Sequence, residues 1–149
     1  MDPADADLQL GRKVPIPATP ADAIIDLVPA PPDHFLVRLS CPEFTSLCPY
    51  TGQPDFAHIV IDYIPQDYLI ESKALKLYLA SFRNHGAFHE AVTCEIGNKL
   101  ADVAQPMWLR VNAFWFPRGG IPIDVFWEVG DRPVWLYLPQ IDIQTYRAR

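Results

Sequence analysis

The sequence predicts an α+β domain with an antiparallel four-stranded sheet and two helices on one of its faces. Three observations support this: two strand-like segments come first, two segments of helical periodicity follow, and two strand-like segments come after them. Strands that flank a pair of helices in the order ββααββ are typical of α+β folds. A chain of 149 residues, 50% of them hydrophobic, is long enough for one domain with a core.

The first two strands are predicted at residues 35–40 and 58–64. The second alternates with β-branched residues and ends at Pro65. Residues 44–56, between them, are rich in Pro, Gly and Thr and are expected to form a loop.

The helical segments follow from residue 72 onward. Ser72 is the expected N-cap of the first helix. Gly86 is expected to separate the two helices, and Pro106 to follow a second helix that runs to about Ala104. The residues expected to face inward are Leu75, Leu79 and Phe82 in the first helix, and Phe88, Val92, Ile96, Leu100 and Val103 in the second.

The last two strands are predicted at residues 108–116 and 121–129, with a turn at 117–120. Trp108, Trp115 and Trp127 are expected to be core aromatics of these strands. The exposed edges of such a sheet often pair between subunits, and the short apolar segment 135–138 could add to an interface.

Residues 1–33 are predicted to form an acidic, proline-rich arm, separate from a single domain at 34–149. The arm holds seven of the 16 prolines and six acids against two bases. Because proline fixes φ and lacks an N–H donor, this segment is expected to be extended or irregular.

Composition excludes several classes of function. A net charge of −6 argues against binding to nucleic-acid phosphates, and no apolar run is long enough for a membrane span. Three cysteines and an acidic N-terminus indicate a cytoplasmic protein without a disulfide scaffold. The seven glycines form neither a Rossmann nor a P-loop motif.

The segment that holds Cys48 and Asp55 is the main candidate for a catalytic site. A loop thiol becomes a nucleophile when its pKa is lowered, and a nearby carboxyl group can supply the proton that addition requires. The alternative is a buried structural cysteine.

His89 and Glu90 open the second predicted helix, where a glutamate either simply suits the helix dipole or recognises the N–H groups of a base-like ligand. His85 and His89, spaced i and i+4, could in principle join Cys41 and Cys48 in a metal site, although the spacing of the cysteines is wider than usual.

Cationic side chains mark a possible phosphate site. Lys73 and Lys76 share a helix face with Arg83, and Arg118 lies in the predicted turn. They form either a solvated surface or a patch for a phosphate-bearing ligand.

Three segments carry a resemblance to a known family: CPEFTSLCPYTGQPDF, ESKALKLYLASFRNHGAFHE and FPRGG. Together they resemble the NADPH-dependent 7-cyano-7-deazaguanine reductases of queuosine biosynthesis, in their short, single-module form. The second segment distinguishes these reductases from the GTP cyclohydrolase I relatives that share their fold.

The resemblance implies a tunnelling fold whose subunits form rings, typically pentamers stacked as decamers, with sites between subunits. It implies reduction of a nitrile to a primary amine with two NADPH. Cys48 would attack the nitrile carbon to give a covalent thioimide, and Asp55 would protonate the nitrogen.

The resemblance also implies further site residues and no metal. Ile70, Glu71, Ser72, His89 and Glu90 would contact the deazaguanine. Lys73, Lys76 and Arg118 are assigned to the cofactor phosphates on their charge alone. The alternatives are a zinc-dependent, pterin-forming hydrolase on the same fold and a non-catalytic ring protein that binds purines. A Cys48–Cys94 disulfide depends on their proximity in the fold.

Overall fold

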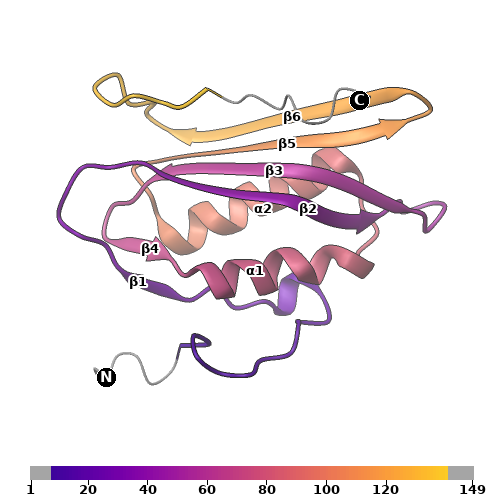
Figure 1. Ribbon diagram of the computed structural model, residues 1–149, viewed down its shortest axis with the longest axis horizontal. Helices are drawn as coiled ribbons and strands as arrows, with labels where there is room; N and C mark the ends of the chain where they lie inside the picture. The colour runs from indigo at the N-terminus through magenta and orange to yellow at the C-terminus, as the bar shows by residue number, and fades with distance from the viewer. Residues whose placement is uncertain (1–7, 141–149) are drawn as a thin grey trace.

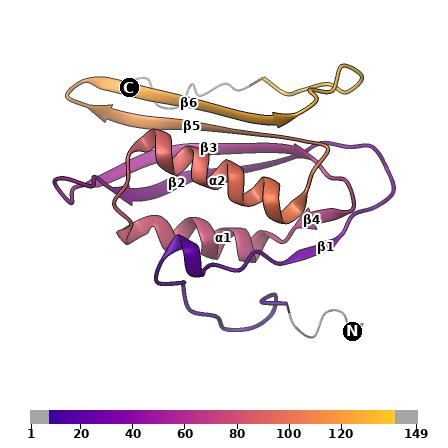
Figure 2. The same cartoon turned by 180° about the vertical axis from the view of Figure 1, so that it is seen from behind.

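The computed structural model describes residues 8–140 and confirms the predicted order of strands and helices. The main sheet is antiparallel, in the order β2-β3-β5-β6, and both helices cover one of its faces (Figures 1 and 2). Its strands are β2 (Val37–Leu47), β3 (Pro54–Ile64), β5 (Trp108–Arg118) and β6 (Ile121–Gly130). The helices are α1 (Ser72–Ser81), a short 3-10 turn (Phe82–Asn84) and α2 (His89–Ala104).

The core lies between the helices and the sheet. Val92, Ile96 and Leu100 of α2 are fully buried there, as the periodicity predicts. Trp115 is also fully buried there, and Trp127 packs against the cluster while partly exposed. Trp108 is fully buried outside this cluster, with the Arg110 guanidinium over its ring. A Cβ at Gly97 would come within 2.4 Å of the Trp127 ring, so this glycine is what lets α2 approach β6.

Phe88 does not face inward as predicted. It is the N-cap of α2, with extended backbone, and its side chain is 57% exposed. The helical periodicity begins only at His89, so it does not govern the direction of the preceding side chain. Val103, at the other end of α2, is only partly buried.

The predicted loop at 44–56 is much shorter in the structure. Phe44–Leu47 continues β2 after a register shift between Cys41 and Phe44, and residues 54–56 already belong to β3. Only residues 48–53 form the turn. Pairing of 44–47 with 54–57 overrides the turn-forming composition of this segment.

The N-cap of α1 is Glu71 rather than the expected Ser72. Its carboxylate accepts hydrogen bonds from the backbone N–H groups of Lys73 and Ala74, both at 2.9 Å. Glu71 thus satisfies two of the free N–H donors with which every helix begins.

Residues 8–33 contain regular structure that the proline-rich composition does not predict. They include a 3-10 turn (Pro20–Asp22) and β1 (Leu27–Pro29), which pairs with β4 (Tyr68–Ile70) in a second, two-stranded sheet. Ala23 and Ile25 are buried in the core. This segment therefore packs against α1, which it underlies in Figure 1.

The face of the sheet away from the helices carries a buried ion pair network. Asp62 is fully buried and contacts Arg38 at 2.6 Å and Arg110 at 2.8 Å. Both guanidinium groups also donate to the carbonyl of Pro139, which holds the segment after β6 against this face. Within residues 8–140, no helix is long and apolar enough to cross a membrane.

Candidate active site

A cavity of about 170 Å³ lies where the β2–β3 turn, the start of α2 and the end of β5 meet. Its polar lining residues are Cys48, Asp55, His89, Glu90 and Arg118. These are five of the predicted site residues, drawn from segments far apart in the sequence.

A tight turn holds Cys48 in the wall of this cavity. The Cys48 N–H donates to the Gln53 carbonyl at 2.8 Å, and the Gly52 N–H donates to the Cys48 carbonyl at 3.0 Å. Gly52 has a φ of 66°, a left-handed conformation that glycine adopts without steric cost. The turn leaves the Cys48 side chain half-buried.

The Cys48 thiol is activated by its surroundings. Hydrogen bonds from the Thr51 side chain and backbone, from Arg118 and from the Tyr50 backbone lower its pKa to about 6. Cys48 is therefore largely a thiolate at neutral pH, which is the nucleophilic form. Thr51 is not among the predicted site residues. A hydroxyl residue three positions after a cysteine in a glycine-containing turn could have indicated a hydrogen-bond donor to the thiol.

Asp55 is buried and contacts two cationic or ionisable side chains. The Arg118 Nη1 lies 3.2 Å from its Oδ1. The His89 Nε2 lies 3.2 Å from its Oδ2, although the angle there is not that of a hydrogen bond. The carboxyl group thus lies beside an imidazole and a guanidinium that both face the thiol-bearing cavity.

The other predicted site residues lie elsewhere in the chain. Ile70, Glu71, Ser72, Lys73 and Lys76 belong to the beginning of α1 and the residues before it, at the end of the sheet away from the β2–β3 turn (Figure 1). Within one chain, the structure does not bring them to the Cys48 cavity.

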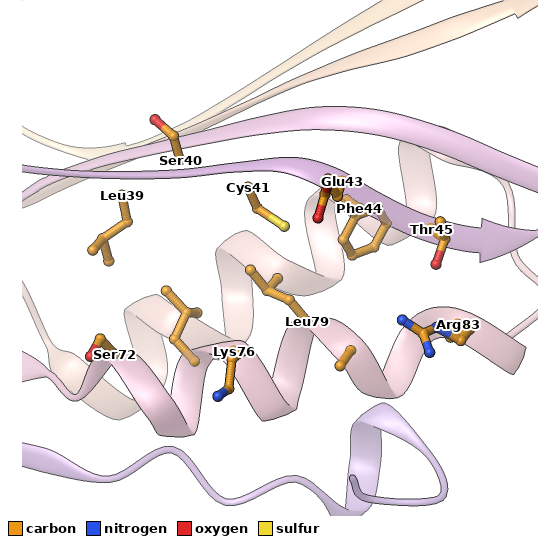
Figure 3. A pocket seen from close by; sticks show the side chains of 12 residues that line it. Leu39, Ser40, Cys41, Glu43, Phe44, Thr45, Ser72, Lys76, Leu79 and Arg83 are labelled. Carbon is orange, nitrogen blue, oxygen red and sulfur yellow. The ribbon is translucent and has the colours of Figure 1, made fainter. Parts of the chain in front are cut away.

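Ser72 and Lys76 line a second hollow, a groove of about 350 Å³ between β2 and α1 (Figure 3). Arg83, Glu43 and Cys41 line the same groove. Lys73 instead donates from its ammonium group to the backbone carbonyls of Gln9 and Arg12. The N-terminal segment therefore binds the ammonium group of Lys73, one of the three side chains assigned to the cofactor phosphates.

Comparison with known proteins agrees with this arrangement. The family model described as "QueF-like protein" matches residues 54–134. A protein of Rhodopseudomonas palustris (strain HaA2) is 60% identical over 146 residues, covering 97% of this chain and 92% of its own. One of Sinorhizobium fredii (strain NBRC 101917 / NGR234) is 57% identical over 143 residues, covering 95% and 93%. Both are named NADPH-dependent 7-cyano-7-deazaguanine reductase.

The chain belongs to this reductase family. Its fold is also that of a solved relative, the archaeosine synthase QueF-Like in the apo form, with a TM-score of 0.60 at 24% identity over 66% of this chain and 96% of that one. The tunnelling fold predicted from the sequence is thus confirmed.

The four residues of the metal-site hypothesis are dispersed in this reductase. Cys41 lines the groove beside α1, whereas Cys48 and His89 line the cavity of about 170 Å³ at the β2–β3 turn. His85 precedes α2, so it does not share a helix face with His89, and it lies 3.8 Å from Glu95. Within residues 8–140, no three His, Cys, Asp or Glu side chains gather as a metal site. Cys41, Cys48 and Cys94 are all free thiols.

Proposed function

We propose that this chain reduces the nitrile of 7-cyano-7-deazaguanine with NADPH, and that Cys48 is the nucleophile. One observation carries the assignment of the nucleophile: a thiol whose pKa is about 6 opens into the same small cavity as a buried carboxyl group, Asp55. A nitrile is a weak electrophile, so covalent addition of a thiolate divides a difficult reduction into easier steps.

In the first step, the Cys48 sulfur forms a bond to the nitrile carbon, and one π bond of the C≡N group breaks. The nitrogen takes up a proton, which we assign to Asp55, and the product is a thioimide. His89 and Arg118 flank Asp55 at 3.2 Å and would hold its carboxyl group toward the nitrogen. Cys48 would leave as a thiolate after the first of the two reductions, giving an imine that the second reduction converts to the amine.

Glu90 and His89 are the residues proposed to recognise the deazaguanine within this chain. A carboxylate offers two acceptor oxygens that match the adjacent N1–H and 2-amino donors of a guanine-like edge. Phe88, exposed at the cavity wall, and Tyr50 beside it, with ring centroids 5.8 Å apart, offer flat surfaces against which the planar base can stack.

We propose that a neighbouring subunit completes the site. The cavity of about 170 Å³ is smaller than the roughly 300–1,000 Å³ typical of ligand sites. The expected substrate residues Ile70, Glu71 and Ser72 lie at the far end of the same chain, so a second copy would have to supply them. Within residues 8–140, the outer edges of β2 and β6 pair with no further strand, which supports ring assembly as a pentamer or decamer.

Lys73, Lys76 and Arg118 are proposed to hold the phosphates of NADPH. Lys76 is exposed along the β2–α1 groove and Arg118 lies at the Cys48 cavity, so these cations would meet one anion only across two subunits. When bound, NADPH supplies the hydride equivalents, two per nitrile. Arg118 would then serve both the cofactor and the Cys48 thiolate. We place the reaction in the cytoplasm, which the three free thiols support.

The test is turnover with the nitrile substrate. We expect NADPH to be oxidised only when the nitrile is present. Two NADPH should be consumed for each molecule of amine, with the amine quantified by mass spectrometry. Cys48→Ala should abolish it, whereas Cys94→Ala, on α2 outside the cavity, should leave it intact. Lack of nitrile-dependent NADPH oxidation by the wild-type oligomer would refute the proposed function.

A further inference from the structure

We infer that Trp115 and Thr93 are positioning residues that fix the His89 imidazole against Asp55. Neither side chain lines the cavity, and Trp115 was expected to serve only the core. The inference rests on the proposed function, because it assigns to these two residues an effect on the proton that the nitrile nitrogen receives.

The first observation is a parallel ring stack. The His89 imidazole lies on the Trp115 indole with ring centroids 4.1 Å apart and an angle of 5° between the planes. Trp115 is fully buried, and His89 is 6% exposed. The indole face therefore sets the plane in which the imidazole lies, and Nε2 in that plane is 3.2 Å from Oδ2 of Asp55.

The second observation is the link that Thr93 makes between these two rings. Its hydroxyl donates to the His89 carbonyl one helical turn earlier at 2.8 Å, and accepts from the Trp115 Nε1–H at 3.2 Å. Thr93 is fully buried, so both bonds are shielded from water. One hydroxyl thus ties the beginning of α2 to the indole that supports the imidazole.

A third contact restrains the indole itself. Phe44 meets Trp115 edge to face, with ring centroids 5.7 Å apart and an angle of 87°. Phe44 of β2 and Thr93 of α2 contact the indole, and His89 stacks on its face. This arrangement exceeds what filling the core requires, since an aliphatic side chain would fill volume without fixing an imidazole plane.

The chain offers a matched control in Trp108. It is also fully buried on β5, and its Nε1 also donates to a side chain, Glu128, at 2.7 Å. It lies at the other end of the strand from Arg118 and outside the catalytic cavity. A tryptophan substitution that acts only through stability should behave alike at both positions.

The experiment measures kcat, KM and the rate at which the nitrile modifies Cys48 without NADPH. Misplacement of a catalytic group by about 1 Å can cost on the order of a hundredfold. We therefore expect Trp115→Leu to lower kcat and the adduct rate by roughly 10- to 100-fold, with a much smaller change in the KM for NADPH. Trp115→Phe, which keeps a flat ring under His89, should recover most of the loss, and the matched control Trp108→Leu should leave the rates unchanged.

Thr93 and a double variant complete the test. Thr93→Val should reproduce the loss and Thr93→Ser should restore it, which keeps the inference testable if Trp115→Leu fails to fold. In a His89→Ala background, Trp115→Leu should lower the adduct rate no further, because the residue that it positions is gone. Wild-type rates in Thr93→Val, or an additive loss in the double variant, would overturn the inference, whereas failure of wild-type turnover would refute the proposed function instead.

Discussion

Arg118 contacts Asp55 at the Cys48 cavity, with 3.2 Å between Nη1 and Oδ1 although the residues are 63 positions apart in the chain. The same guanidinium group helps to lower the pKa of the Cys48 thiol. One cation thus acts on both the proposed nucleophile and the proposed proton donor. It brings together the β2–β3 turn and the end of β5.

The lowered pKa of Cys48 predicts how its alkylation depends on pH. Iodoacetamide labelling at Cys48, followed by peptide mass spectrometry, should be half-maximal near pH 6, because the thiolate is lost as the pH falls through that value. Thr51→Val should move the midpoint upward, toward about 8.5 for an ordinary thiol.

Two internal controls accompany this labelling. Burial raises the pKa of the Cys41 thiol, so Cys41 should react only at more alkaline pH. Thr45→Val, in β2 and outside the turn, should leave the Cys48 midpoint near pH 6. A wild-type midpoint near that of a free thiol would contradict the activation by Thr51 and Arg118.

Glu71 should contribute to stability as a helix cap. Glu71→Ala removes the acceptor for the Lys73 and Ala74 N–H groups and should lower the free energy of unfolding by about 0.5–2 kcal/mol. Glu71→Asp, a residue that caps well, should cost less. Equal stability of Glu71→Ala and wild type in urea unfolding would show that the cap contributes little.

In the N-terminal segment, truncation of Ile25 should destabilise the protein, whereas truncation of Ile24 should not. Ile25 is 7% exposed and Ile24 is 71% exposed. Ile25→Ala should therefore lower the free energy of unfolding by about 2–5 kcal/mol. Ile24→Ala should change it by no more than about 0.5 kcal/mol. Similar small effects at both positions would mean that this segment does not pack as described.

Asp62 should be far more important for stability than an exposed ion pair. Its removal in Asp62→Ala leaves Arg38 and Arg110 without their shared carboxylate and should cost about 3–5 kcal/mol. Arg132→Ala breaks an exposed i,i+4 pair with Glu128 and should cost at most about 1 kcal/mol. If the two variants unfold at the same denaturant concentration, the buried network is not a main source of stability.

The hydrophobic periodicity of the sequence predicted the elements that bury one apolar face. Val92, Ile96 and Leu100 show this, because a helix that packs on a sheet needs one apolar face. The cap at Glu71 was missed because residue preference favours Ser72, and only backbone angles reveal which residue precedes the helix. β1 was missed because its three residues owe their structure to pairing with β4, about 40 residues away.

The sequence allows site residues to be proposed, but it does not give their geometry. Resemblance to the reductases pointed to Cys48, Asp55, His89 and Glu90, and the fold brings these together. Periodicity could not show that Arg118 would join them, because that contact depends on how two strand ends meet. Nor could it show that Ile70, Glu71 and Ser72 would lie at the other end of the chain's own fold.

The most direct test of the central claim is the intact mass of the protein after incubation with 7-cyano-7-deazaguanine in the absence of NADPH. The proposed mechanism predicts that the mass of the chain rises by the full mass of the nitrile. The adduct should map to Cys48, form in Cys41→Ala and Cys94→Ala, and be absent in Cys48→Ala. An unmodified wild-type chain that nevertheless reduces the nitrile, or an adduct that persists in Cys48→Ala, would contradict it.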